Sequence, residues 1–313
     1  MSIKKVSCFN CKRDAFYFRK YSGEYLCKEC FKKSIITKTR RTISKYKMIR
    51  YGDRVGVAVS GGKDSLSLLQ VLSKLAKEHS NELYAITVDE GIANYREESI
   101  SFVKEFTDNL RVPLKIVSYE DLYGFSLDEA MKERKIKLTS CTFCGVLRRR
   151  ALDLAAKELK VNVLCTAHNL DDIIQSFMIN LLVGEMDRIK WVDPRLEPKS
   201  EFAIRRVKPF MELYEEEISL YAYLNNIPFQ SIPCPYSGEG IRGEIRRFLN
   251  SLEAKHAGAK YGILKTALKM AQNLNVEGRK QIKFCVLCGN LSSSSICQVC
   301  KMLGLVNLSP ILP

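Results

Sequence analysis

The middle of the chain alternates short apolar runs with longer stretches in which apolar residues recur at helical spacing. The apolar runs are rich in Val, Ile and Leu, which is typical of strands buried on both faces of a parallel sheet. The pattern predicts strands at 54–59, 83–88, 114–117 and 161–165, and helices at 64–78, 95–109, 144–158 and 170–182. Repeated strand–helix units predict an α/β domain with a doubly wound, Rossmann-like parallel sheet. Ligands of such sheets bind beyond the carboxyl ends of the strands.

The first predicted strand is followed by a glycine-containing loop that is suited to phosphate. Its residues are Ser60, Gly61, Gly62, Lys63, Asp64 and Ser65. The glycines allow successive backbone N–H groups to point into one concavity, and the next helix N-terminus adds a favourable partial charge. Lys63 supplies a positive charge, and Asp64 is a candidate Mg²⁺ ligand. The spacing excludes a Walker A motif, and the string instead resembles the PP-loop of enzymes that split ATP into AMP and pyrophosphate.

A second polar set follows the predicted strand 161–165, which this topology places beside the first loop. Ala167, His168 and Asp172 are candidates for contacts with the ribose, the phosphates or a metal ion. A structural interpretation is equally consistent with these residues alone, because Asn169 is a preferred helix N-cap and acidic residues favour the first turn. Beside loop 60–65, the binding interpretation is favoured.

The 313 residues include 50 basic and 35 acidic side chains, which gives a net charge of +15. Such an excess predicts a polyanionic partner, because bound Lys and Arg release counterions from phosphates; solubility alone is the alternative explanation. No stretch approaches the roughly 18 apolar residues of a spanning helix, and no apolar secretion signal is present at the N-terminus. We therefore expect a cytoplasmic protein with no membrane partner.

Most of the 12 cysteines occur in C-x-x-C pairs, which in a chain without a secretion signal indicate metal or redox sites rather than disulfides. Four of the pairs form two four-thiolate sets, each with the spacing of a structural zinc site. The first set is Cys8, Cys11, Cys27 and Cys30, and the second is Cys285, Cys288, Cys297 and Cys300. Rubredoxin-like iron is the alternative metal.

The fifth pair, Cys141 and Cys144, opens a predicted helix that carries Arg148 within two turns. Nearby cations and a helix N-terminus favour the thiolate form of cysteine. Cys234 lies between two prolines, which stiffen its loop. Three thiolates fit a 4Fe–4S cluster with one open iron that can carry sulfur, and a persulfide resolved through a disulfide is the alternative. Cys165 lies within an apolar strand, so we expect it in the core.

Nearly the whole chain resembles the TtcA/TtuA family of tRNA 2-thiolation enzymes. The resemblance rests on both four-cysteine sets, loop 60–65, the segments 88–96, 141–146 and 167–172, and the loop Cys234-Pro235-Tyr236. The terminal zinc modules separate the chain from the cytidine-modifying TtcA branch. The strings at 89–92 and 141–146 are most similar to the branch named cytoplasmic tRNA 2-thiolation protein 1, which acts on the wobble uridine. TtuA, which acts on the T-loop uridine, is the close relative.

This resemblance implies a tRNA uridine 2-sulfurtransferase that adenylates the C2 oxygen of uracil and then replaces it with sulfur. It implies ATP, Mg²⁺, two Zn²⁺ and a 4Fe–4S cluster on Cys141, Cys144 and Cys234, with Asp64 as a further catalytic residue. Besides loop 60–65, it implies ATP contacts at Asp89, Arg148, Ala167, His168 and Asp172. The implied partners are tRNA and a sulfur donor, either a ubiquitin-like carrier protein or sulfide. Whether the chain forms a homodimer is left open.

Four segments follow from these assignments: a zinc finger at 1–34, a basic helical linker at 35–52, a PP-loop catalytic domain with a helical C-terminal part at 53–278, and a zinc ribbon at 279–313. Within the linker, a helix is expected from about Lys38 to Tyr51.

Two other functions remain open at this point. A PP-loop ligase for lysidine synthesis or amidation needs no cysteine triad, and a non-enzymatic zinc protein that binds nucleic acid has no use for loop 60–65.

Overall fold

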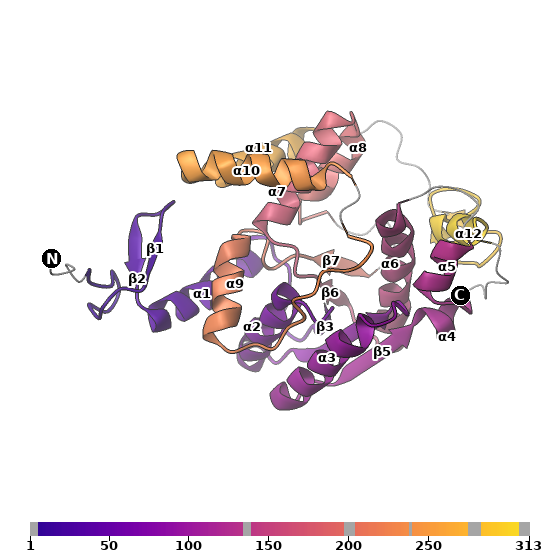
Figure 1. The fold of residues 1–313 in the computed structure, drawn as a ribbon, viewed down its shortest axis with the longest axis horizontal. Coiled ribbons are helices and arrows are strands. Elements are labelled where there is room, and N and C mark those ends of the chain that lie inside the picture. The colour runs from indigo at the N-terminus through magenta and orange to yellow at the C-terminus, as the bar shows by residue number, and fades with distance from the viewer. Residues whose placement is uncertain (1–5, 134–138, 197–203, 238–239, 275–282, 307–313) are drawn as a thin grey trace.

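The central element of the computed structural model, which describes residues 6–133, 139–196, 204–237, 240–274 and 283–306, is a parallel five-stranded sheet (Figure 1). The strand order is β5-β4-β3-β6-β7. The strands are β3 (Arg54–Ala58), β4 (Glu82–Asp89), β5 (Leu114–Ser118), β6 (Val163–Cys165) and β7 (Arg205–Val207). Because the order reverses between β3 and β6, the crevice that binds ligands in such sheets lies at the carboxyl ends of these two strands.

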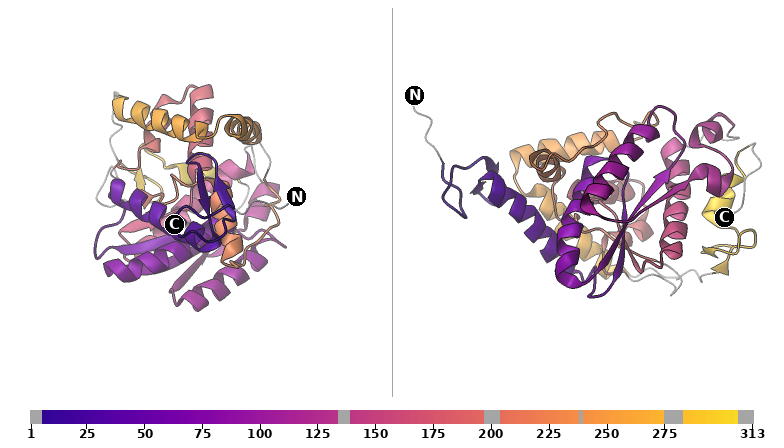
Figure 2. Two further views of the ribbon diagram at one scale, coloured as in Figure 1. Left: turned by 90° about the vertical axis from the view of Figure 1, so that its left-hand side faces the viewer. Right: turned by 90° about the horizontal axis from the view of Figure 1, so that it is seen from below.

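Helices cover both faces of the sheet and link its parallel strands (Figure 2). They are α2 (Lys63–His79), α3 (Arg96–Leu110), α4 (Tyr119–Tyr123), α5 (Leu127–Lys132), α6 (Ser140–Glu158), α7 (Leu170–Leu182), α8 (Met186–Ile189) and the 3-10 helix η1 (Lys190–Val192). After β7 come α9 (Glu215–Leu224), α10 (Arg242–Lys255) and α11 (Ala259–Asn273). Helices α10 and α11 pack against α7. Within the described ranges, no helix combines the length and the apolar character that crossing a membrane requires.

Two small modules lie at opposite ends of the molecule (Figure 1). The finger contains a hairpin of β1 (Tyr17–Arg19) and β2 (Glu24–Leu26), followed by α1 (Lys28–Lys45). The ribbon contains β8 (Lys283–Phe284), β9 (Leu291–Ser292) and α12 (Gln298–Leu303), and α12 packs against α6.

The predicted order of strands and helices in the middle segment is confirmed, with ends that shift by a few residues. The linker helix was placed wrongly: it begins at Lys28, inside the finger, because the Cys27 thiol caps its first turn by accepting from Cys30 N. Strand β7 was missed because its sequence, Arg205–Val207, is not an apolar run. The predicted division between residues 34 and 35 falls within α1, and the one between 278 and 279 lies outside the described residues.

Successive residues of the central strands pack into two separate cores. On β6, Val163 and Cys165 face the core that contains residues of α2 and α9, and Leu164 faces the core beneath α6. All three side chains are fully buried, which explains why this strand has no polar face. The prediction that Cys165 is a core residue is confirmed.

A buried carboxylate on α9 joins the finger to the rest of the protein. Glu217 accepts hydrogen bonds from Arg19 Nε at 2.7 Å, Tyr21 OH at 2.9 Å and Lys38 Nζ at 3.0 Å. Its side chain is fully buried, and those of Arg19 and Lys38 are only 5% and 20% exposed. Because a buried charge is tolerated only when it is paired, the hairpin, α1 and α9 must hold one relative position around Glu217.

Replacing Glu217 with Ala should lower the free energy of unfolding by about 3–5 kcal/mol, because Lys38 loses its carboxylate partner and the buried Arg19 keeps only Glu24. The matched control is Glu216→Ala: Glu216 is exposed and reaches Tyr17 OH at 3.4 Å, so its loss should cost about 0.5 kcal/mol or less. Urea titrations followed by circular dichroism, with zinc in the buffer, compare the variants. Equal effects of the two substitutions would contradict the assigned role of Glu217.

Candidate active site

Loop 60–65 connects β3 to α2 at the carboxyl edge of the sheet. Gly61 has a φ of +82°, and a Cβ there would approach the backbone oxygen of Ser99 to 2.6 Å, so this position requires glycine. Ser65 Oγ accepts from Ser60 N at 3.0 Å and donates to Gly62 O at 2.9 Å. These bonds hold the loop in one conformation before any ligand arrives.

The start of α2 is open to an anion. Gly62 is its N-cap and provides no side-chain cap, so N–H groups of the first turn remain for a ligand. A cavity of about 370 Å³ opens here, lined by Ser60, Gly62, Lys63, Asp64, Ser65, Phe229, Gln230 and Ser231. Gln230 N donates to Gly61 O at 3.1 Å, which holds the far wall against the loop. This geometry fits the phosphates of a nucleotide.

Lys63 is shared between two carboxylates. Its Nζ lies 3.2 Å from Asp64 Oδ1 and 3.2 Å from Glu215 Oε1. Burial raises the pKa of Asp64 to about 6; Lys63 opposes this rise, and Glu215 and Asp172 add to it. Despite the ion pair, the buried Oδ1 of Asp64 accepts no well-oriented hydrogen bond. An unsatisfied carboxylate oxygen beside a phosphate site fits a divalent cation.

The second predicted set lies beside loop 60–65, because β6 pairs with β3. Asn169 and Asp172 cap α7 reciprocally: Asp172 N donates to Asn169 Oδ1 at 3.0 Å, and Asn169 N to Asp172 Oδ2 at 3.2 Å. The capping interpretation is therefore correct, and Asp172 is also near enough to Asp64 for its charge to raise the pKa of that carboxyl. His168 Nδ1 lies 2.9 Å from Thr166 Oγ1. The lining of the 370 Å³ cavity does not include Asp89, Arg148, Ala167, His168 or Asp172.

The three cysteines that the sequence singled out lie together. Cys144 is buried in the first turns of α6, Cys141 is exposed, and Cys234 is half-buried. Burial raises the pKa of Cys234, and the nearby thiols of Cys144 and Cys141 raise it further. Cys141 Sγ lies 3.5 Å from Tyr236 O, and Tyr236 OH donates to Asp128 Oδ1 at 2.7 Å. The loop that carries Cys234 is thereby anchored against α5 and α6.

A chain of charged groups connects these cysteines to loop 60–65. Arg148 Nη2 donates to Cys144 Sγ at 3.0 Å, and Arg148 Nε lies 2.8 Å from Glu90 Oε1. The other oxygen of Glu90 lies 2.8 Å from Arg96 Nε, and Arg96 Nη1 donates to Ser60 O at 2.9 Å. The side chains of Glu90 and Arg96 are each 5% exposed. Glu90 therefore positions two guanidinium groups, one at the cysteines and one at the loop.

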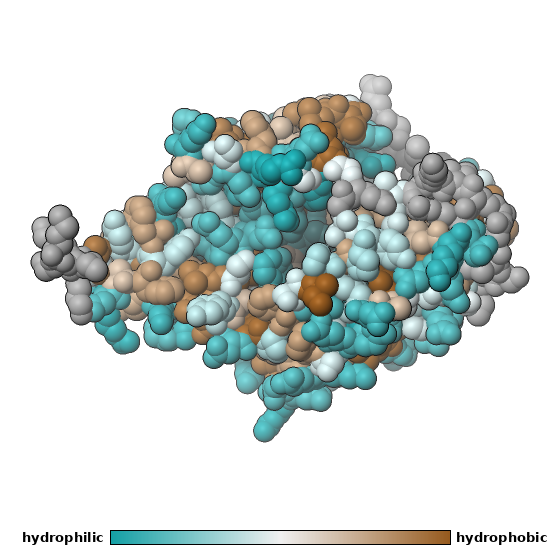
Figure 3. Space-filling model, viewed as in Figure 1, coloured by the Kyte–Doolittle hydropathy of each residue, from teal (hydrophilic) through white to brown (hydrophobic). Residues whose placement is uncertain are grey.

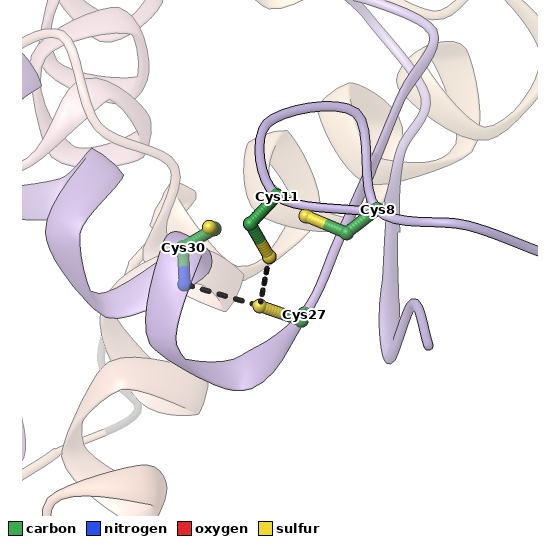
Figure 4. Close-up of side chains that lie close together, drawn as sticks. All are labelled: Cys8, Cys11, Cys27 and Cys30. Atoms are coloured by element: carbon green, nitrogen blue, oxygen red, sulfur yellow. Dashed lines mark hydrogen bonds between the residues drawn. The ribbon is translucent and has the colours of Figure 1, made fainter. Parts of the chain in front are cut away.

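The four thiols of the finger converge from the 8–11 turn and the start of α1 (Figure 4). The sulfurs of Cys8, Cys11, Cys27 and Cys30 all lie within 4.8 Å of one another. Burial raises the pKa of Cys8, but backbone N–H groups, that of Cys27 foremost, outweigh it and lower this pKa to about 6. Burial and the neighbouring thiols raise the pKa of Cys30 to about 12, so four thiolates need a cation between them. A tetrahedral Zn²⁺ fits.

The ribbon repeats this arrangement with Cys285, Cys288, Cys297 and Cys300, whose sulfurs also lie within 4.8 Å of one another. Against the effect of burial, backbone N–H groups lower the pKa of Cys285 to about 6. Among the described residues, only these two sets bring three or more ligand side chains so close. The sulfurs of Cys141, Cys144 and Cys234 do not all lie within this distance of one another, so these thiols fit a 4Fe–4S cluster better than a single ion.

Comparison with known families identifies the same parts. Residues 33–253 match the family described as the PP-loop domain, and residues 7–32 match the N-terminal LIM domain of the 2-thiouridine synthetase TtuA. The chain belongs to the TtcA/TtuA family of PP-loop proteins. The family resemblance inferred from the sequence is thus confirmed.

Similar proteins of this family cover almost the whole chain. A probable sulfurtransferase of Methanocaldococcus jannaschii is 36% identical over 307 residues, 96% of this chain and 89% of the relative. Cytoplasmic tRNA 2-thiolation protein 1 of Xenopus laevis is 38% identical over 305 residues, with the same coverage of 96% and 89%. The structure of the U34-tRNA thiolase NcsA from Methanococcus maripaludis with its [4Fe-4S] cluster superposes with a TM-score of 0.85, at 31% identity, covering 98% of this chain and 99% of that one.

Four residues that shape the site were not predicted from the sequence: Glu90, Arg96, Glu215 and Gln230. Glu90 and Arg96 lie in the segment 88–96 that carried the family resemblance, and Glu90 directly follows a strand end, which is a usable signal. Glu215 and Gln230 come from the first turn of α9 and the loop after it. No local motif marks either residue, since only the tertiary fold brings them to loop 60–65.

The raised pKa of Asp64 predicts a pH-dependent effect of Asp64→Asn on stability, in the absence of ATP and Mg²⁺. The unfolded chain releases this proton near pH 3.8 and the folded protein near 6, so ionisation destabilises the fold as the pH rises through this window. The variant should therefore match the wild type below about pH 4 and exceed it at pH 7.5 by on the order of 2 kcal/mol.

Urea titrations at both pH values measure this difference. Asp108→Asn, at an exposed position on α3, is the matched control and should change stability by less than about 0.5 kcal/mol at either pH. An Asp64→Asn variant that is less stable than the wild type at pH 7.5 would refute the assigned direction of the pKa shift.

Proposed function

We propose that this chain is a tRNA uridine 2-sulfurtransferase that uses ATP to replace the C2 oxygen of a uracil with sulfur. The observation that carries the proposal is the chain of contacts from Ser60 through Arg96, Glu90 and Arg148 to Cys144, because it joins a nucleotide loop and a thiol centre in one site. In this proposal, loop 60–65 activates the C2 oxygen of uracil, and the thiols deliver the sulfur. Relatives named sulfurtransferase, tRNA 2-thiolation protein and U34-tRNA thiolase support the same reaction.

The proposed target is the wobble uridine. The name U34-tRNA thiolase of a similar structure supports this position. The T-loop uridine is the second candidate, because residues 7–32 match the N-terminal domain of TtuA. The mass of the nuclease fragment that contains 2-thiouridine distinguishes the two positions.

In the first step, the N–H groups of loop 60–65 and of the α2 N-terminus hold the phosphates of ATP. Lys63 exchanges its contact with Glu215 for the phosphates, and Glu215 retains Arg246, whose Nη2 lies 3.6 Å away. The uracil O2 attacks the α-phosphorus, and pyrophosphate leaves as the bond to the β-phosphate breaks. The C2 atom then carries AMP, which is a far better leaving group than oxide.

In the second step, sulfur attacks C2 and AMP leaves with the original oxygen. Cys141, Cys144 and Cys234 are the groups that would hold the sulfur source. Arg148 directs the Cys144 thiol, and Tyr119 OH fixes this turn by donating to Cys144 O at 2.8 Å. A 4Fe–4S cluster bound by these three thiolates would supply an iron that no protein thiolate occupies and that can take up sulfur.

Two further kinds of metal ion belong to the proposal. Asp64, with its unsatisfied oxygen, is the proposed Mg²⁺ ligand beside the phosphates, and Asp172 is the second candidate. The two four-thiol sets are proposed zinc sites. Because protein thiolates fill all four positions of each site, these ions would stabilise the modules rather than react.

The proposed partners are tRNA and a sulfur donor, either a carrier protein resembling ubiquitin or free sulfide. The net charge of +15 supports a polyanionic substrate. The names of several relatives as cytoplasmic proteins support the cytoplasm as the place of action. A homodimer is compatible with this proposal and is tested by sedimentation.

Cys141→Ala and Cys234→Ser should each lower 2-thiouridine formation by roughly 100-fold or more, because each removes a ligand of the sulfur-carrying centre. The affinity for tRNA should not change. The assay uses protein reconstituted with iron and sulfide without oxygen, then ATP, sulfide and unmodified tRNA, with mass spectrometry of the product and a measurement of bound iron. Cys165→Ala, in the core and outside the centre, is the control that should keep both iron and activity.

Each alternative function has its own signature in this assay. Undiminished thiolation by Cys141→Ala would refute the proposal. A wild type that forms AMP without 2-thiouridine, together with a Cys234→Ser variant that keeps this activity, would favour a PP-loop ligase that needs no triad. A protein that binds tRNA but forms no AMP with tRNA, ATP and sulfide would be a non-enzymatic binding protein.

Glu90→Gln should lower the thiolation rate about 10- to 100-fold at unchanged tRNA affinity, because Arg148 and Arg96 lose the carboxylate that positions them. The absorption spectrum of the reconstituted cluster should shift as well, which a purely structural role elsewhere would not cause. Glu97→Gln, an exposed carboxylate on α3, is the control. A wild-type rate and spectrum for Glu90→Gln would exclude the positioning role.

A further inference from the structure

The outward face of the finger hairpin is aromatic. On β1 and β2, the buried side chains are Arg19 and Leu26, while Phe18 and Tyr25 point outward, with Phe16 two positions before Phe18 on the same side. These three rings are 45% (Phe16), 43% (Phe18) and 40% (Tyr25) exposed. The solvent face of an antiparallel pair is ordinarily polar, so three exposed rings require an explanation.

Two of the rings stack on each other, and a cation lies over the third. Phe18 and Tyr25 are cross-strand partners whose rings stack with centroids 4.4 Å apart and planes at 25°. Lys28 Nζ lies 5.2 Å from the centroid of Phe16. The hairpin is held by the four-thiol set on one side and by Glu217 on the other. The aromatic surface is therefore rigid before any partner binds.

The charge around this surface favours a polyanion. Lys12, Arg13, Lys20 and Lys28 are exposed in the same module. Its exposed acids are Asp14 and Glu29, and Glu29 pairs with Lys32 at 2.6 Å, whereas Glu24 is half-buried and bonded to Arg19 and Ser22. In the space-filling view, apolar side chains in brown and tan lie over the finger at the left (Figure 3). Exposed rings combined with Lys and Arg are the means by which proteins bind unpaired bases and their phosphates.

The aromatic surface also borders a hollow that leads toward the candidate active site. Phe18, Lys20 and Tyr21 line a cavity of about 540 Å³ between the hairpin and helices α9 to α11. Its inner wall includes Glu215, which pairs with Lys63 of loop 60–65. With Asp171, Glu216 and Glu253 the wall carries four carboxylates against the two amines of Lys20 and Lys260, so the interior of the hollow repels phosphate. We therefore assign contacts with nucleic acid to the aromatic surface at the edge of the hollow and not to its interior.

We propose that Phe16, Phe18 and Tyr25 form a stacking surface for unpaired bases of the tRNA substrate, with Lys20 and Lys28 meeting the adjacent phosphates. The identity of the RNA rests on the proposed function. The surface itself rests on the hairpin geometry. Stacking on the finger would fix the RNA at one end of the molecule while its target base reaches loop 60–65.

The test is the affinity of the reconstituted full-length protein for an unmodified tRNA transcript, measured by fluorescence anisotropy at several salt concentrations. Phe18→Ala combined with Tyr25→Ala should raise the Kd tenfold or more and leave the salt dependence unchanged, because stacking carries no charge. Lys20→Gln combined with Lys28→Gln should instead lower the slope of log K against log salt by about two, one per lost phosphate contact.

Three controls separate stacking from other effects. Phe18→Tyr combined with Tyr25→Phe keeps both rings and should bind like the wild type. Tyr51→Ala removes an exposed ring that is 79% accessible and lies near Ser80, away from the finger, so its Kd should not change. Phe18→Leu combined with Tyr25→Leu preserves apolar volume without a ring and should still weaken binding. The zinc content of each variant shows whether its finger is folded.

An unchanged Kd for both the Ala pair and the Leu pair, with zinc retained, would overturn the inference. A protein partner would give a different result: tRNA affinity and sulfide-dependent thiolation would be kept, and only thiolation driven by a carrier protein would fall. That outcome would also overturn it. A wild type that binds tRNA but transfers no sulfur would refute the proposed function and leave the stacking surface standing.

Discussion

The ion pairs of Glu90 are the interaction on which the candidate site depends. This carboxylate is 5% exposed and lies between Arg96 and Arg148, and a buried charge that loses its counter-charge costs several kcal/mol. Arg96 also binds backbone oxygens at the end of β4 and in loop 60–65. The loop and Cys144 therefore cannot shift independently. In the proposed reaction an activated carbon and a sulfur must meet, and a misplacement of about 1 Å can cost a factor on the order of 100.

Helix α9 fixes the position of the finger relative to the site. Its first turn directs Glu215 toward Lys63 and Glu217 toward Arg19 and Lys38, so one turn of one helix touches both loop 60–65 and the finger. The backbone N–H of Glu215 donates to Asp171 at 2.9 Å, which ties this turn to α7. A module that would be too small to fold on its own core thus gains a fixed position relative to the site.

The sequence was sufficient for features that depend on local pattern. The buried strands, loop 60–65 and the two four-thiol sets follow from periodicity and spacing, and Asn169 was recognised as a possible cap. It was not sufficient where partners meet only through the tertiary fold. Glu215 reaches Lys63 from 152 positions away, and Gln230 reaches Gly61 from a loop with no motif. The linker helix was displaced because a thiol, Cys27, is its cap, and capping by cysteine is not a usual start signal.

The spacing of the thiols separates two chemistries within one chain. The terminal sets pack four sulfurs within 4.8 Å and surround them with backbone N–H donors, so a single ion held there would have four protein ligands and no position for a substrate. The central thiols of Cys141, Cys144 and Cys234 are farther apart, are reached by a guanidinium rather than by a fourth thiol, and leave Cys141 exposed. Cysteine is thus enclosed in the terminal modules and accessible beside loop 60–65. A reaction that transfers sulfur requires such an accessible centre.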